Sequence, residues 1–199
     1  MPSWLQRGLP LIVLALLVAM SYSGVVHNGY VWDDRYFLVD YAWLDSAGSA
    51  IRVAFSPLFQ NESYVRPVPL LTLFAEGLLT NRNPAVSHLV NTLIHLACAW
   101  LVYLLARDAL ARSGRGGGIV RWSALTLAAL FAVHPALSEA VIWVSSRFDL
   151  VATLMMLLGL WIATRDRWPS PAVAIGVATC FLLAALSKEL SLIHISEPT

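Results

Sequence analysis

The chain has 199 residues, of which 58% are hydrophobic and only 13% are charged. Because soluble domains carry roughly a quarter charged residues, this composition excludes an ordinary soluble domain and predicts an integral membrane protein in contact with a lipid bilayer. The formal net charge of +1 argues against a nucleic-acid partner, and the two cysteines fit neither a disulfide framework nor a zinc site.

The first apolar segment, Leu9 to Val26, is long enough for a membrane span. A cleavable signal peptide is the alternative, because Arg7 precedes the apolar stretch and small residues follow it, although no A-x-A cleavage site ends it. A long polar and aromatic segment follows, over residues 27–84. Within it, Arg66 to Leu79 is apolar but short and contains two prolines, which favours a helix lying along the membrane interface.

Four further apolar segments predict spans, at residues 85–105, 122–135, 150–164 and 171–186. In the first of these, three polar residues follow at i, i+3 and i+7 and therefore share one helical face; they are His88, Asn91 and His95. The predicted fold class is an all-α integral membrane protein, a polytopic helical bundle of about five transmembrane helices. A long external loop that bears interfacial helices follows the first span.

The charges of the loops predict the orientation. Arginines concentrate in residues 107–121 and 165–167, whereas the loop after the first span carries six acids against four arginines. The positive-inside rule therefore places the N-terminus in the cytoplasm and that loop outside. Asp33, Asp34 and Glu139 then lie on the same external face of the membrane.

The last ten residues, Leu190 to Thr199, resemble the translation of a transposon-end adapter used in shotgun sequencing. We therefore expect residues 1–189 to be the natural part, a fragment of a longer gene product. Residues 190–199 are expected to be a non-native tail and take no part in the functional reasoning.

Two groups of polar residues occur next to the apolar segments. The first is the tetrapeptide WDDR at residues 32–35, and the second runs over residues 134–150. If the second is helical after its proline, Glu139, Trp143 and Arg147 follow at i, i+4 and i+8 and form a stripe. Such a stripe suits an anionic sugar donor, with the arginine for phosphate, the indole for a sugar face and the carboxylate for a hydroxyl proton.

Structural interpretations of these charges remain open. An exposed carboxylate or arginine at a membrane interface is often solvated or paired with a neighbour, and one of Asp33 and Asp34 could cap a helix. Their mutual repulsion also favours a nearby cation, a divalent metal or one raised pKa. Glu139 lies in an otherwise apolar stretch, where an acid is costly unless it faces a polar cavity, so a functional role gains weight.

Five short motifs occur in one order along the chain: VWDD, YVRPVPLLTL, NPAVSHLVNTLIH, HPALSEAVIWVSSRFDLVA and LSKE. Together they resemble the membrane domain of the multispanning GT-C glycosyltransferases, most closely the protein O-mannosyltransferase-like branch with tetratricopeptide repeats, which includes bacterial members. The resemblance covers residues 10–189. It implies a polyprenyl-phosphate-linked sugar donor, a protein or glycan hydroxyl as acceptor, and transfer on the external face, here the periplasmic face of a bacterial inner membrane.

Carried over to this sequence, the resemblance implies that Asp33 or Asp34 is a catalytic base or a metal contact and that Glu139 is the second catalytic acid. A divalent metal is therefore a candidate cofactor, although the acids are adjacent and not spaced as D-x-D. The expected substrate-binding residues are Arg66, His134, Trp143, Arg147 and Asp149. Because the chain holds fewer spans than such enzymes have, the fragment is expected to be inactive alone.

The leading hypothesis is thus a glycosyltransferase that uses a lipid-linked sugar, for which mannose is one candidate. The alternative is a transporter or flippase, in which His88, Asn91, His95 and Glu139 line a path. The acids gather at one membrane face and form no ladder across it, which disfavours transport. A membrane anchor for a repeat scaffold is a third, non-catalytic alternative.

Overall fold

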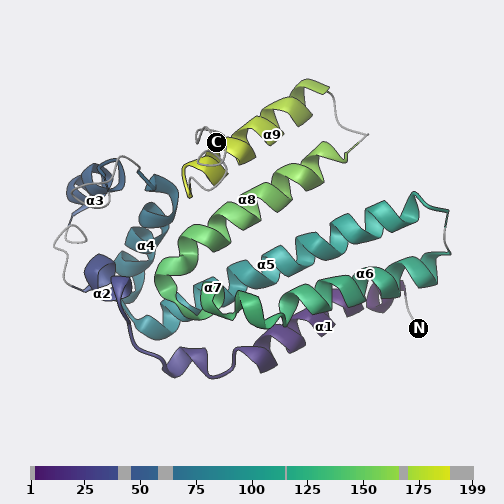
Figure 1. The fold of residues 1–199 in the computed structure, drawn as a ribbon, viewed down its shortest axis with the longest axis horizontal. Coiled ribbons are helices and arrows are strands. Elements are labelled where there is room, and N and C mark those ends of the chain that lie inside the picture. The colour runs from purple at the N-terminus through teal and green to yellow at the C-terminus, as the bar shows by residue number, and fades with distance from the viewer. Residues whose placement is uncertain (1–2, 40–45, 58–64, 115, 166–169, 189–199) are drawn as a thin grey trace, which may run out of the picture.

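The computed structural model describes residues 3–39, 46–57, 65–114, 116–165 and 170–188 (Figure 1). Every regular element within these ranges is a helix, which confirms the predicted all-α class. The expected non-native tail at residues 190–199 and the arginine at position 167 lie outside the described residues.

Within the described part of the chain, the long helices run side by side and form an elongated bundle (Figure 1). They are α1 (Ser3–Ser21), α5 (Pro84–Ala111), α6 (Gly117–Ala132), α8 (Arg147–Ala163) and α9 (Ser170–Ala185). Helix α5 packs against α6 and α8, α9 packs against α8, and α1 lies on α5 and α6. The centre of this core, formed by Leu14, Ala99 and Ala128, is fully buried.

Three shorter helices gather at one end of the bundle (Figure 1). They are α2 (Asp33–Leu38), α3 (Ala47–Ala54) and α4 (Pro67–Thr80). Helix α4 matches the expected interfacial helix: Pro67 occupies the first helical position, where its missing N–H is not needed, and Asn81 ends the helix with φ 52°. A second apolar cluster around Leu70, Leu73 and Val144 joins this end to the bundle. The place of α4 along a membrane interface stays a prediction.

The opposite end of the bundle carries the start of α1, the turn between α5 and α6 and the end of α8 (Figure 1). Arg107, Arg112, Arg121 and Arg165 belong to these segments. The bundle therefore separates the arginine-rich end from the end that carries α2, α3 and α4, as the loop charges predict. Which end faces the cytoplasm stays a prediction.

Between α6 and α8 the chain is not one continuous helix. It passes through η3 (Pro135–Leu137), α7 (Ser138–Ile142) and η4 (Val144–Ser146). Trp143 is extended, with φ −83° and ψ 118°, so the helix expected to align Glu139, Trp143 and Arg147 is interrupted, and that prediction is wrong. The physical reason is that Asn91 and Asp34 bond to the backbone here and give it partners outside a helix.

Among the described helices, two are long and apolar enough to cross a membrane, Pro84–Ala111 and Val144–Ala163. A third span results if α6 and the segment Pro135–Ile142, which meet at a bend of 51°, are counted together. The segments Gly8–Ser21 and Ser170–Ala185 are apolar helices but shorter than a usual span. The five expected spans therefore all coincide with helices, while their number as true spans stays a prediction.

Candidate active site

The two polar motifs of the sequence lie in direct contact. Asp34, in the first turn of α2, is fully buried, and its Oδ1 accepts hydrogen bonds from the backbone N–H and the hydroxyl of Ser145, at 2.7 and 2.6 Å. Its Oδ2 accepts a hydrogen bond from the N–H of Val31 at 3.2 Å. Asp34 therefore joins the loop after α1 to the segment between α7 and α8, 111 residues further along the chain.

The residue before α2 is held in a strained turn. Trp32 has φ 48° and ψ −122°, and the N–H of Asp34 donates to the carbonyl of Val31 at 2.9 Å, which together define a type II′ turn. Glycine is the usual residue at this position of such a turn. The turn presents the exposed Trp32 indole edge-on to Trp143, with ring centroids 5.9 Å apart.

Beside these two indoles lies a pocket of about 540 Å³, a size typical of small-molecule sites. Its walls come from the connection between η1 (Val25–His27) and α2, from α5, and from α7 with the residue that follows it. Two indoles, two imidazoles and a carboxylate are among its lining groups; they belong to Trp32, Trp143, His27, His88 and Glu139. Glu139 is exposed. The predicted acid, Glu139, and the predicted aromatic residue, Trp143, therefore line the same open cavity.

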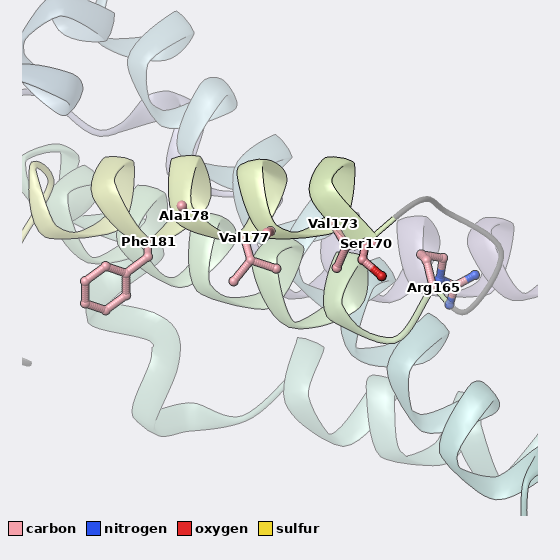
Figure 2. A pocket seen from close by; sticks show the side chains of 7 residues that line it. Arg165, Ser170, Val173, Val177, Ala178 and Phe181 are labelled. Carbon is pink, nitrogen blue, oxygen red and sulfur yellow. The ribbon is translucent and has the colours of Figure 1, made fainter.

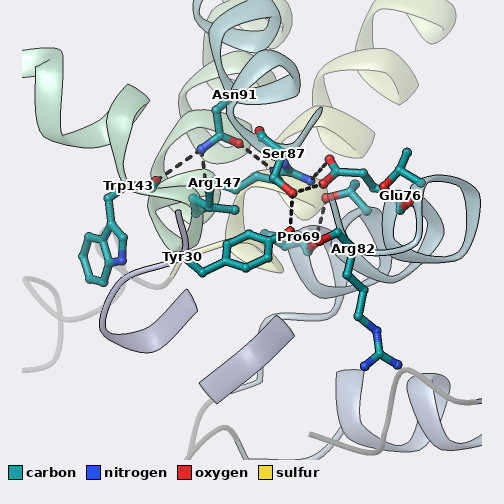
Figure 3. Close-up of polar contacts among 11 residues, drawn as sticks. Tyr30, Pro69, Glu76, Arg82, Ser87, Asn91, Trp143 and Arg147 are labelled. Atoms are coloured by element: carbon teal, nitrogen blue, oxygen red, sulfur yellow. Dashed lines mark hydrogen bonds and ion pairs between the residues drawn. The ribbon is translucent and has the colours of Figure 1, made fainter. Parts of the chain in front are cut away.

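A buried ion pair lies at the start of α8 (Figure 3). Arg147 is 0% exposed, and its Nη1 lies 2.8 Å from Oε2 of Glu76 on α4. Its Nε donates to Oδ1 of Asn91 at 2.8 Å, and its Nη2 donates to the carbonyl of Ser87 at 3.1 Å. The guanidinium is therefore enclosed by protein groups, a geometry that favours a positioning role. Its expected role in holding phosphate stays a prediction.

Asn91 connects this ion pair to the helix break (Figure 3). Its Nδ2 donates to the carbonyls of Trp143 and Val144, at 3.2 and 3.3 Å. These carbonyls lie where α7 ends and η4 begins; each also accepts a backbone N–H in the 3-10 turn, and Asn91 adds a second hydrogen bond in place of an α-helical one. Asn91 therefore stabilises the break, and Arg147 in turn holds the amide of Asn91 in place.

A chain of hydrogen bonds extends from the ion pair to the loop before α2 (Figure 3). Ser87 donates to Oε1 of Glu76, so the single hydroxyl hydrogen of Tyr30 is shared between the hydroxyl of Ser87, at 2.9 Å, and the carbonyl of Arg82, at 3.2 Å. Burial raises the pKa of Tyr30 above its usual value, so the phenol stays neutral at physiological pH. Four segments are thereby fixed relative to one another: this loop, α4, α5 and α8.

The polar residues expected on one face of α5 are buried there together, which confirms the predicted periodicity. His88, Asn91 and His95 expose 1%, 0% and 1% of their surface. Nε2 of His95 lies 3.0 Å from the carbonyl oxygen of Ala132, the last residue of α6. Asn91 and His95 thus each bond to carbonyls at the end of a neighbouring helix. His88 differs, because neither of its ring nitrogens has a hydrogen-bond partner among the described residues.

Asp33 and Arg66 belong to the short helices at this end of the molecule. Asp33 is partly buried in the first turn of α2, and the guanidinium of Arg66, just before α4, lies over the ring of Phe148 at 5.1 Å from its centroid. No group of three or more His, Cys, Asp or Glu side chains in the described ranges is arranged to hold a metal ion. A metal contact at Asp33 or Asp34, and the catalytic roles of both, stay predictions.

Two further expected substrate-binding residues contact other protein groups. Asp149, in the first turn of α8, forms an ion pair with Lys188. His134 is exposed, and its Nδ1 accepts a hydrogen bond from the N–H of Ala136 at 3.2 Å, which caps the short helix η3. These contacts do not test substrate binding, so both roles stay predictions.

Another pocket, of about 640 Å³, runs along α9 from Arg165 to Phe181 (Figure 2). It is lined by Arg165 and by a row of mostly apolar α9 side chains that includes Val173, Val177 and Phe181. None of the predicted site residues lines it. The pocket beside Glu139 is therefore the candidate active site.

Over most of its length the chain is similar to proteins named protein O-mannosyl-transferase. It is 32% identical over 184 residues to Tmtc1 and 34% identical over 190 residues to Tmtc2, both of Drosophila melanogaster, in each case over 87% of this chain. It is 27% identical over 189 residues to TMTC3 of Mus musculus, over 89% of this chain. The chain is a homologue of these protein O-mannosyl-transferases.

This homologue spans about a fifth of the length of the curated relatives it matches, 20% of Tmtc1 and 19% of Tmtc2. The similarity confirms the expected relationship to the protein O-mannosyltransferase branch. No protein-family profile matches the chain, and no solved structure matches it.

Two residues on which the site of this O-mannosyl-transferase homologue depends were not predicted from the sequence. Glu76 carries the same sequence feature as Glu139, an acid within an otherwise apolar segment, and that feature alone predicts a buried cation as its partner. Ser145, which bonds to Asp34, has no such feature, because a serine in a membrane-interface motif is unremarkable. Only the fold reveals it.

Proposed function

We propose that the chain forms part of a membrane glycosyltransferase that moves a sugar from a polyprenyl-phosphate-linked donor to a protein or glycan hydroxyl on the external face. Mannose is the sugar that the names of the relatives suggest. The observation that carries the proposal is the meeting of the two motifs, Asp34 with Ser145 and Trp32 with Trp143, beside one pocket. A donor confined to the bilayer requires such a pocket beside membrane helices.

In the proposed reaction, the acceptor hydroxyl attacks the anomeric carbon of the sugar. The bond from that carbon to the phosphate oxygen breaks, and the lipid phosphate leaves with the bonding electrons. The proton of the hydroxyl passes to a carboxylate, which acts as the general base. Glu139 suits this role because its exposed side chain lines the pocket, and Asp33 is the second candidate.

Asp34 and Arg147 are proposed to position the site. Both oxygens of Asp34 already accept hydrogen bonds, so its charge fixes the segment that carries Ser145 and Trp143. Arg147 is enclosed by protein groups and fixes α8 against α4. The cation for the departing phosphate is proposed to be Arg66, whose side chain is partly exposed before α4.

The contacts of α5 weaken the transporter alternative. A transport path through His88, Asn91 and His95 requires these side chains to be available to a passing substrate. Asn91 and His95 are instead bonded to backbone carbonyls of neighbouring segments. We propose a bacterial inner membrane as the location, and the arginine-rich loops support an N-terminus in the cytoplasm with the pocket on the periplasmic side.

Transfer by the full-length gene product, from polyprenyl-phosphate mannose to a serine- and threonine-containing peptide in proteoliposomes, tests the proposal. Glu139→Gln is expected to lower the transfer rate by about 10²–10⁴-fold, because the amide cannot accept the proton. Asp108→Asn, at the opposite end of the bundle, is the matched control and should transfer normally. Absence of transfer by the intact wild-type protein, or near-normal transfer by Asp33→Asn, Asp34→Asn and Glu139→Gln alike, would contradict the proposal.

A further inference from the structure

His88 is the polar residue of α5 for which the fold offers no partner. It lines the candidate pocket and is only 1% exposed, yet neither ring nitrogen bonds to any group in the described part of the chain. Asn91 and His95, on the same helical face, both bond to backbone carbonyls. Burying an imidazole without partners is costly, so helix packing alone does not explain a histidine at this position.

A second group without a partner lines the same pocket. Nε1 of Trp143 is buried and has no acceptor within the described ranges. His88 reaches the pocket from α5, whereas Trp143 reaches it from the end of α7. Two walls of one cavity therefore carry polar groups to which the described residues offer no hydrogen bond.

The lining also indicates the chemical class of that molecule. Glu139 supplies a negative charge, and no lysine or arginine is among the described residues that line the pocket, so a phosphate would lack a countercharge there. The indoles of Trp32 and Trp143 offer apolar surface, and the imidazole and indole N–H groups offer hydrogen bonds. This combination suits a neutral ring that carries several hydroxyl groups.

We propose that the pocket binds the sugar ring of the donor, not its phosphate, and that His88 and Nε1 of Trp143 hydrogen-bond to the sugar hydroxyls. The identity of the ligand as a donor sugar rests on the proposed function. A neutral imidazole has one donor and one acceptor nitrogen, and a hydroxyl both donates and accepts, so either tautomer of His88 can make the contact. His88 is thereby a substrate-binding residue that contributes to sugar specificity.

Stability measurements separate this role from a structural one. His88→Leu should leave the melting temperature of the intact protein unchanged or raise it, because the histidine has no protein hydrogen bond to lose. The matched substitution is His95→Leu, on the same helical face two turns further along. It should lower the melting temperature, because the carbonyl of Ala132 loses its partner. A fall for His88→Leu as large as that for His95→Leu would overturn the inference.

Binding of methyl α-D-mannopyranoside to the intact protein in nanodiscs, followed by saturation-transfer NMR, is the direct test. His88→Leu should weaken binding by about tenfold or more, which is the loss expected for one buried hydrogen bond to a ligand. His88→Gln should lose less, because its amide keeps a donor and an acceptor. Inorganic phosphate at matched ionic strength should not displace the sugar.

The outcomes distinguish this inference from the proposed function. Binding that depends on His88, without transfer from the lipid-linked donor, would uphold the sugar contact at His88 and overturn the proposed function, and with it the identity of that sugar as part of a donor. Normal transfer and normal sugar binding by His88→Leu would overturn the inference and leave the proposed function standing. No sugar binding by the wild type, or displacement by phosphate, would also overturn it.

Discussion

Arg147 shows at the scale of one residue how a charge is accommodated within an apolar helix. Its helix is one of the two long enough to span a membrane, where an arginine is expensive unless it is paired and enclosed. Glu76, Asn91 and Ser87 supply that enclosure from two other helices. The charge thus fixes the relative positions of α4, α5 and α8.

A double-mutant cycle tests this arrangement. Glu76→Gln and Arg147→Met should each lower the free energy of unfolding by about 3–5 kcal/mol, because each leaves the charge of the other residue buried without its counterion. The double variant should lose clearly less than the sum of the two. Unfolding in detergent micelles, followed by helical circular dichroism, gives the four values; strictly additive losses would show that the pair is not coupled.

The turn at Trp32 provides a second test at this scale. Its φ of 48° is strained for any residue with a side chain, at a cost of about 1–3 kcal/mol, whereas glycine adopts it freely. Trp32→Gly and Trp32→Ala both lose the contact with Trp143, but only glycine relieves the strain. We therefore expect Trp32→Gly to be the more stable of the two in thermal unfolding. The reverse order would refute a strained turn.

At the scale of the elements, the length of the apolar segments predicted the long helices, and helical periodicity predicted the buried polar face of α5, because both depend on local sequence. The break at Trp143 could not be predicted in this way, since nothing within residues 136–146 forbids a helix. It depends on Asn91, 52 residues from Trp143, and on Asp34, 111 residues from Ser145, whose side chains bond to the backbone there. The pairing of Arg147 with Glu76 could not be predicted from local sequence either, because it joins two distant segments of the chain.

The contact between α8 and α9 is a further property of the elements. A Cβ atom added at Gly159 would lie 3.1 Å from Cβ of Cys180, and one at Gly176 would lie 3.2 Å from Cγ2 of Ile162. Small residues therefore allow these two helices to approach closely, as is usual between helices in membranes.

Enlarging one of these glycines should separate the helices. Gly159→Leu is expected to destabilise the protein by about 1–3 kcal/mol or more, because the added side chain meets Cys180 across the contact. Gly118→Leu on α6 is the matched control, since a Cβ there meets nothing within 4 Å. Melting temperatures in detergent provide the comparison, and equal values for the two variants would disprove close packing at Gly159.

At the scale of the whole molecule, the two ends of the bundle differ in chemistry. At one end Asp108 pairs with both Arg107 and Arg165, and Arg112 donates to the carbonyl of Thr164. The other end carries the acids of the predicted site, the neighbouring indoles of Trp32 and Trp143, and the candidate pocket. A bundle that crosses a membrane in one fixed orientation is expected to have one arginine-rich end and one end without such an excess of arginine.

Cysteine labelling tests that orientation. In a background in which the buried Cys98 and Cys180 are replaced by alanine, Ser46→Cys should react with an impermeant thiol reagent in intact cells. Ser113→Cys, in the arginine-rich turn, should react only after the membrane is permeabilised. Both positions are exposed, so access depends on the side of the membrane. Labelling of both, or of position 113 alone, in intact cells would contradict the orientation.

The enclosure of Arg147 also has a consequence for biosynthesis. Each of its three partners, Glu76, Ser87 and Asn91, precedes it in the chain, so all three have been synthesised before the arginine leaves the ribosome. A helix with an unpaired arginine at its end enters the bilayer at an energetic cost. We therefore expect Val144–Ala163 to insert efficiently only after α4 and α5 are in place, which makes the order of synthesis part of how this protein reaches its membrane topology.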